Sequence, residues 1–247
     1  MKASSDGCGC FPTGRHYPGI AHLLRTVVRG LADEFAADAP WQELDVVLLD
    51  VETTGRDAAV DRVVEVGVAI GRHGDVILRK NWLVNPGIPI PASATEVHGI
   101  KDDDVKDAPT FAGVADELAE ILRAKIPGAY NANFDKTFIL SEYARLGPRT
   151  GAAPPALRRE TEWLDPLVWA RELQSEERSR ALGDVAARLG ITLENAHRAA
   201  DDAEAALRVF YTLARDPRVP RAYGALVQEQ RRLSLSQADE CRMWRKS

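Results

Sequence analysis

Residues 46–55 read Val46-Val47-Leu48-Leu49-Asp50-Val51-Glu52-Thr53-Thr54-Gly55, an apolar run that continues into two acids two positions apart. The apolar run predicts a buried strand. Side chains on a strand alternate between faces, so Asp50 and Glu52 project to the same side, roughly 6–7 Å apart along the chain. Two carboxylates placed in this way repel each other, and a divalent cation that prefers oxygen ligands relieves the repulsion. On this pair alone, it stays open whether one acid is instead exposed and the other ion-paired.

The flanking sequence predicts an α/β fold with a mixed sheet. Strands are expected at 63–70 and 76–84, and the short turn His73-Gly74-Asp75 between them predicts an antiparallel meander of three strands. A proline-rich loop at 85–91 separates the meander from a short strand at 126–130. Apolar residues at helical spacing predict helices after Thr110, from about 133 to 146, at 164–173, at 182–189 and around 203–214. This order favours a meander joined by parallel strands and flanked by helices.

Polar residues gather at two further points of this layout. The segment Asn131-Ala132-Asn133-Phe134-Asp135 follows the short strand, so Asp135 falls in the first turn of a helix beside a strand end. Open α/β sheets keep their ligands at such places. His197 and Asp202 fall around the start of the last of these helices, close enough to serve one site.

Taken together, these segments resemble the three motifs of the DEDDh family of 3′–5′ exonucleases, which includes the proofreading subunit of bacterial DNA polymerase III. The matching segments are 50–55, 131–135, and His197 with Asp202 five residues on. The resemblance covers residues 46 to about 214 and implies a ribonuclease H-like fold. One departure is Tyr130, where relatives often have histidine, and this position flanks the second motif without being a ligand.

The resemblance implies that two Mg²⁺ or Mn²⁺ ions are held by the four acids of the motifs, Asp50, Glu52, Asp135 and Asp202. It further implies that His197 is the general base, which suits a side chain that gains and loses a proton near neutral pH. The spacing within the third motif selects Asp202 over Asp201, which is expected to be a solvated acid at the helix start.

The same resemblance implies that the end of the nucleic acid is bound by residues around these motifs, namely Thr53, Thr54, His98 and Asn131. His98 lies in the loop segment Val97-His98-Gly99-Ile100. Phe134 has two interpretations, a core residue or a platform for base stacking, and the core interpretation is favoured.

Length and composition place few limits on function. The chain has 247 residues, 45% of them hydrophobic, with a net charge of −5, so it can bury a sizeable core but has no overall basic field for nucleic acid. Acids that hold metal ions weaken that last argument. The sequence shows neither a transmembrane run nor a signal segment, so no membrane association and a cytoplasmic location are expected.

Three regions are predicted: 1–45, 46–215 and 216–247. The first is expected to hold a disordered segment and an amphipathic helix at 20–37, which could serve homo-oligomerisation. Cys8 and Cys10 with downstream histidines form a weak metal-cluster candidate. The third region is a basic, helical tail with six basic and three acidic residues from 221 to 247. Its segment 230–235 faintly resembles peptides that dock on the bacterial sliding clamp.

The predicted function is metal-dependent 3′–5′ hydrolysis of single-stranded DNA ends, releasing 5′-mononucleotides. Three alternatives stay open. The chain could trim RNA, because the motifs determine the chemistry and not the sugar. It could be a catalytically silent nucleic-acid-binding module, although all five motif positions are filled. It could also act mainly as the partner of a DNA polymerase.

Overall fold

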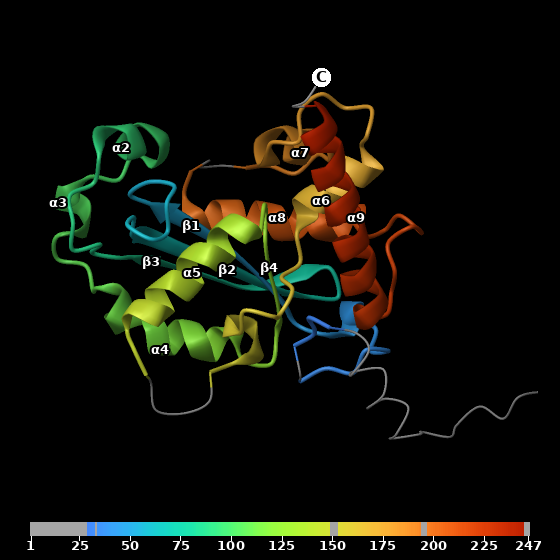
Figure 1. The fold of residues 1–247 in the computed structure, drawn as a ribbon, viewed down its shortest axis with the longest axis horizontal. Helices are drawn as coiled ribbons and strands as arrows, with labels where there is room; N and C mark the ends of the chain where they lie inside the picture. The colour runs from blue at the N-terminus through green and yellow to red at the C-terminus, as the bar shows by residue number, and fades with distance from the viewer. Residues whose placement is uncertain (1–28, 33, 149–152, 194–196, 245–247) are drawn as a thin grey trace, which may run out of the picture.

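The computed structural model describes residues 29–32, 34–148, 153–193 and 197–244. A four-stranded sheet forms the centre of this described part (Figure 1). In spatial order its strands are β3 (Asp75–Leu83), β2 (Val63–Arg72), β1 (Val46–Thr53) and β4 (Ile126–Ala129). β3, β2 and β1 pair antiparallel, and β1 pairs parallel with β4. The prediction of a mixed α/β sheet is confirmed.

The meander follows from the tight turn between β2 and β3. His73 and Gly74 have φ angles of 55° and 93°, which is the left-handed conformation of a two-residue hairpin turn. A parallel strand cannot be reached by so short a turn. The chain therefore leaves β3 and returns to β4 through three helices, α2 (Ala92–His98), α3 (Asp102–Val105) and α4 (Phe111–Leu122).

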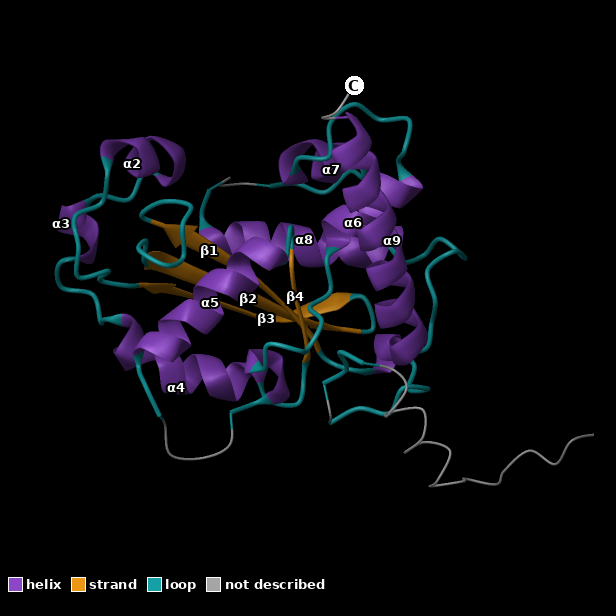
Figure 2. Cartoon of the chain, in the orientation of Figure 1, coloured by secondary structure: helices purple, strands orange, loops and turns teal. Residues whose placement is uncertain are grey.

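The remaining helices complete two layers around the sheet (Figures 1 and 2). They are α5 (Asn133–Arg145), α6 (Pro166–Leu173), α7 (Leu182–Arg188), α8 (Ala199–Leu213) and α9 (Tyr223–Trp244), with short 3₁₀ turns at Trp41–Glu43 and Pro155–Leu157. Val47 and Leu49 of β1 share one core cluster with α4 and α5, whereas Val46 and Leu48 share the other with α6, α8 and α9. Because side chains of β1 alternate between the two faces of the sheet, each helical layer packs around its own core cluster.

The α2 and α3 helices were not predicted, because each is shorter than the window in which helical periodicity shows. α2 begins after Pro91 and ends at Gly99, whose φ of 75° is the usual left-handed end of a helix. Its buried residue Ala94 packs with Val64 of β2 in a small third cluster. This cluster fixes α2 beside the end of β2.

Residues before β1 and residues of the C-terminal helix α9 pack in the same core cluster as α6 and α8. Leu31, Ala37 and Trp41 precede β1 and belong to the same cluster as Leu226 and Leu233 of α9. The predicted helix at 20–37 is wrong for the residues that are described near its end, because 34–39 form turns there. Its remainder, with the Cys8 and Cys10 candidate, lies outside the described residues.

The clamp-docking hypothesis for 230–235 stays a prediction, and this conformation does not favour it. Gln230 and Leu233 are 4% and 3% exposed, and a docking peptide needs both side chains free. The helix α9 instead presents them to α6 and the core. Within the described residues, no helix is long and apolar enough to cross a bilayer.

Candidate active site

The C-terminal end of β1 carries the first two acids. Val46 to Leu49 are buried, and burial then alternates, with Asp50 and Glu52 partly exposed and Val51 buried between them. The acids continue the face that Val46 and Leu48 present to α8. They therefore point toward α8 from the edge of its core.

Asp135 approaches the same strand from the other layer. It lies in the first turn of α5 and is 3% exposed. Its Oδ1 accepts a hydrogen bond of 3.0 Å from the backbone N–H of Val51, the residue between the two acids of β1. This bond fixes Asp135 beside Asp50, and the Asp50 charge acts directly on it.

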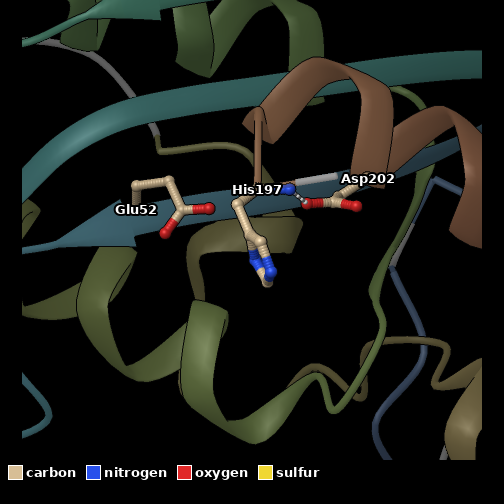
Figure 3. Close-up of side chains that lie close together, drawn as sticks. All are labelled: Glu52, His197 and Asp202. Atoms are coloured by element: carbon tan, nitrogen blue, oxygen red, sulfur yellow. Dashed lines mark hydrogen bonds between the residues drawn. The ribbon is translucent and has the colours of Figure 1, made fainter. Parts of the chain in front are cut away.

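The start of α8 brings the third motif to the cluster. Asp202 lies in the first turn of α8, is 8% exposed, and accepts a hydrogen bond of 2.9 Å from the backbone N–H of His197 (Figure 3). The ligand atoms of Glu52, His197 and Asp202 lie within 4.8 Å of one another. The neighbouring acid Asp201 is drawn away, because it forms an ion pair with Arg79 of β3.

Two residues of β2 that were not predicted, Glu65 and Gly67, position the start of α8 against the sheet. Glu65 is fully buried and accepts hydrogen bonds from Asn81, from the Arg198 guanidinium and from the backbone N–H of Ala199. Gly67 lies opposite Asp50, and a Cβ atom there would approach the carbonyl carbon of Ala199 to 2.0 Å. Only glycine lets α8 start directly on the sheet. A charged residue inside the apolar run 63–70 was the available signal for Glu65.

The residues expected to contact the substrate differ in how exposed their side chains are. Thr53 and Thr54 are buried, and their hydroxyls bond to Gly55 and within the β1–β2 loop. Asn131 is exposed at the end of β4, with a φ of 65°. Phe134 is partly buried against Phe138, with ring centroids 4.9 Å apart, in agreement with the core interpretation.

His98 has a free hydrogen-bonding atom near the site. It is 6% exposed, and its Nδ1 accepts from the N–H of Ile100 at 3.0 Å, so the neutral ring carries its proton on Nε2. That Nε2 makes no hydrogen bond of good geometry among the described residues, although the backbone of Thr53 is close enough to interact with the ring. Burial lowers the pKa of His98, although the backbone of Thr53 and the charge of Glu65 oppose the shift.

Burial and mutual repulsion raise the pKa values of the acids in the cluster. Burial, followed by the charges of Asp202 and Glu65, raises the pKa of Asp50 to about 8. Burial, followed by the charge of Asp50, raises the pKa of Glu52 to about 9. The pKa values of Asp135 and Asp202 are also raised, chiefly by burial. Such a cluster is stable in its charged form only with positive charge among the carboxylates.

Residues 47–210 match the sequence model of the exonuclease family. The chain belongs to this family. Curated relatives of this exonuclease include DNA polymerase III of the PolC type from Streptococcus pneumoniae, 33% identical over 174 residues, and from Caldanaerobacter subterraneus, 32% identical over 168 residues. The aligned region is 70% and 68% of this chain, respectively, but the chain covers only 11% of either polymerase.

Solved exonuclease structures share the fold. Exonuclease X in complex with 5′-overhanging duplex DNA superposes with a TM-score of 0.57 at 18% identity, covering 74% of this chain and 99% of that one. Exonuclease I of E. coli in complex with a dA16 oligonucleotide gives a TM-score of 0.61 at 20% identity, covering 71% and 42%. These likenesses establish the ribonuclease H-like fold of the exonuclease.

The donor set of the exonuclease fits a divalent cation. Glu52, His197 and Asp202 form the close group, while Asp50 and Asp135 lie outside it and interact with its acids or with each other through their charges. Carboxylate oxygens are the ligands that Mg²⁺ and Mn²⁺ prefer. The raised pKa values fit the same interpretation, because a bound cation takes the place of the protons that a metal-free cluster retains.

The metal-free exonuclease is expected to lose stability as the pH rises from 6 to 9. The pKa values of Asp50 and Glu52 in the folded chain, about 8 and about 9, lie above the ordinary 3.8 and 4.5. Their contribution to stability is full below the ordinary values and is lost as pH rises through the raised ones. Melting temperatures in EDTA should fall over this range, and Mn²⁺ should reduce the fall. A double variant, Asp50→Asn with Glu52→Gln, should lose most of the pH dependence; an unchanged slope would contradict the account.

Proposed function

We propose that this exonuclease removes nucleotides from the 3′ end of single-stranded DNA by divalent-metal-dependent hydrolysis, releasing 5′-mononucleotides. The observation that carries the proposal is the close group of Glu52, His197 and Asp202 beside Asp50 of the same β1 face, with Asp135 bonded to the backbone between the two β1 acids. The acids come from β1, α5 and α8, and His197 directly precedes α8. So close a group of acids, two buried and two partly buried, is costly without a bound cation.

Four acids would hold two Mg²⁺ or Mn²⁺ ions: Asp50, Glu52, Asp135 and Asp202. Two such ions, when bound, supply charge stabilisation to the attacking and leaving oxygens of a phosphoryl displacement. Asp50 and Glu52 contribute ligands from one strand face, and Asp135 is kept in register with them by its bond to Val51. The backbone bond from His197 likewise orients Asp202.

His197 acts as the general base in this proposal. Its side chain is exposed, while its backbone is fixed by the bond to Asp202 and by a φ of 67°. An exposed imidazole beside the acids is within reach of solvent water and can pass the proton on to bulk solvent. The His98 N–H, which makes no hydrogen bond of good geometry within the described residues, is available to donate to the terminal nucleotide.

The polarity and the sugar are tested by one experiment with matched DNA and RNA oligonucleotides. With 5′-labelled DNA and Mn²⁺, we expect a ladder that shortens one nucleotide at a time, and 3′-labelled DNA should release its label at once as a mononucleotide. Faster shortening of RNA would make the chain an exoribonuclease, and the inverse label pattern would reverse the polarity. Binding without cleavage would indicate a silent module.

A DNA polymerase partner and a cytoplasmic location belong to the same proposal. The PolC-type relatives contain the matched region within a much longer chain that is named a DNA polymerase, which favours DNA as substrate. Cleavage of mismatched 3′ ends that rises when a replicative polymerase is added would support the partnership, and unchanged cleavage would argue against it.

A further inference from the structure

A partly buried acid outside the metal cluster, Asp165, accepts hydrogen bonds from the turn that leads to Asp135. Asp165 precedes α6, and its carboxylate accepts three backbone hydrogen bonds, from Asn131 at 2.9 Å, Ala132 at 3.1 Å and Leu167 at 2.9 Å. The third bond caps α6. The other two cross 33 or more residues of sequence to the end of β4, and capping does not require them.

The turn held by these two bonds is the direct approach to a proposed metal ligand. Asn131 has a φ of 65°, a left-handed conformation that asparagine tolerates better than most residues but that still needs support. Ala132 is the residue immediately before α5, and Asp135 lies in the first turn of that helix. A shift of this turn would move Asp135 relative to β1.

Asp165 is itself held by the C-terminal helix α9. The Gln230 side chain is 4% exposed, and its Oε1 accepts from the backbone N–H of Asp165 at 2.8 Å and from Trp169 Nε1 at 3.2 Å. Its Nε2 donates to the carbonyl of Trp163 at 2.9 Å. Gln230 lies outside residues 47–210, which match the exonuclease family model, so this support comes from the part of the chain beyond that match.

We propose that Asp165 and Gln230 are positioning residues that hold the Asn131–Ala132 turn and thereby keep Asp135 in place for metal binding. The inference rests on the proposed function, because Asp135 is assigned there as a ligand. Hydrogen bonds behind a ligand commonly change metal affinity or activity by about 10- to 100-fold. The bonds of Asp165 reach the backbone of the turn before α5 and not the Asp135 side chain itself. We therefore expect an effect at the low end of that range.

Two variants separate this role from simple stabilisation. Asp165→Ser retains a hydroxyl that can cap α6 through Leu167 but does not reach the two N–H groups of the turn. Gln230→Leu changes no charge and removes the acceptor for Asp165. The matched control is Gln237→Leu, because Gln237 donates from the same helix to Val168 of α6 without contacting Asp165.

Calorimetric titration of Mn²⁺ into each protein, with melting temperatures as the check on folding, gives the readout. We expect the Mn²⁺ dissociation constant to rise about tenfold in Asp165→Ser, with the wild-type value in Gln237→Leu. The rise in Gln230→Leu should be smaller, about threefold, because Gln230 acts only through Asp165. Lower melting temperatures with an unchanged dissociation constant in both test variants would overturn the positioning role. A wild-type protein that neither binds Mn²⁺ nor cleaves would instead contradict the proposed function. If Asp165→Ser does not fold, the comparison of Gln230→Leu with Gln237→Leu decides alone.

Discussion

Asp50→Asn is expected to lower the rate of nucleotide release by on the order of a thousandfold and, at the same time, to raise the melting temperature of the metal-free protein. The loss follows from removing a proposed ligand, because several kcal/mol of transition-state charge stabilisation corresponds to about this factor. The gain follows from the cluster itself, since burial and the charges of Asp202 and Glu65 disfavour an ionised Asp50. A neutral side chain of the same shape removes that cost.

The opposite signs make this test specific. Release of labelled nucleotide at saturating Mn²⁺ measures the first effect, and thermal unfolding in EDTA at pH 8 or above measures the second. Asp45→Asn is the matched control, because Asp45 lies just before β1 in a surface ion pair with Arg72, and such pairs contribute little. Its activity should stay within about twofold of wild type. An Asp50→Asn protein that is both inactive and less stable would point to a structural acid instead.

His197→Asn is expected to slow cleavage by between about 10²- and 10⁴-fold, the usual contribution of a general base, while Mn²⁺ binding changes by less than about twofold. Asparagine is chosen because His197 has a φ of 67°, where most side chains are strained. Its backbone N–H should therefore keep its bond to Asp202. The effect should then come from the missing imidazole alone.

A control variant and a measurement of Mn²⁺ affinity distinguish a general base from a metal ligand. His73→Asn replaces another exposed histidine with a positive φ, 55°, in the β2–β3 turn and should leave cleavage unchanged. The ligand atoms of His197 also lie within 4.8 Å of those of Glu52 and Asp202. A fall in Mn²⁺ affinity as large as the fall in rate would therefore make His197 a metal ligand and contradict its role as base.

Local patterns accounted for much of the fold and for the selection of candidate residues. The two-residue period of a strand placed Asp50 and Glu52 on one face, and the structure shows that face turned toward α8. Helical spacing likewise predicted α8 with Asp202 around its start, and the structure places Asp202 in its first turn. These arguments succeed because each uses residues close together in the sequence.

The supporting residues escaped prediction because they act over long sequence separations. Glu65 binds Ala199 across 134 positions, and Gln230 binds Asp165 across 65. No local pattern reports such pairing. The C-terminal region was predicted as a basic, helical tail, and the helix is present. Its packing into the core was not predicted, although Leu226, Gln230 and Leu233 recur at the spacing of a buried helical face.

The most direct measurement follows shortening of 5′-labelled single-stranded DNA and mononucleotide release from 3′-labelled single-stranded DNA by the wild-type protein and by the double variant Asp50→Ala with Glu52→Ala, each with Mn²⁺ and with EDTA. The account predicts a stepwise ladder and free 5′-mononucleotides for the wild-type protein with Mn²⁺ alone. Equal release by the double variant, or by the wild-type protein in EDTA, would contradict the claim that the β1 acids and a divalent cation perform the hydrolysis.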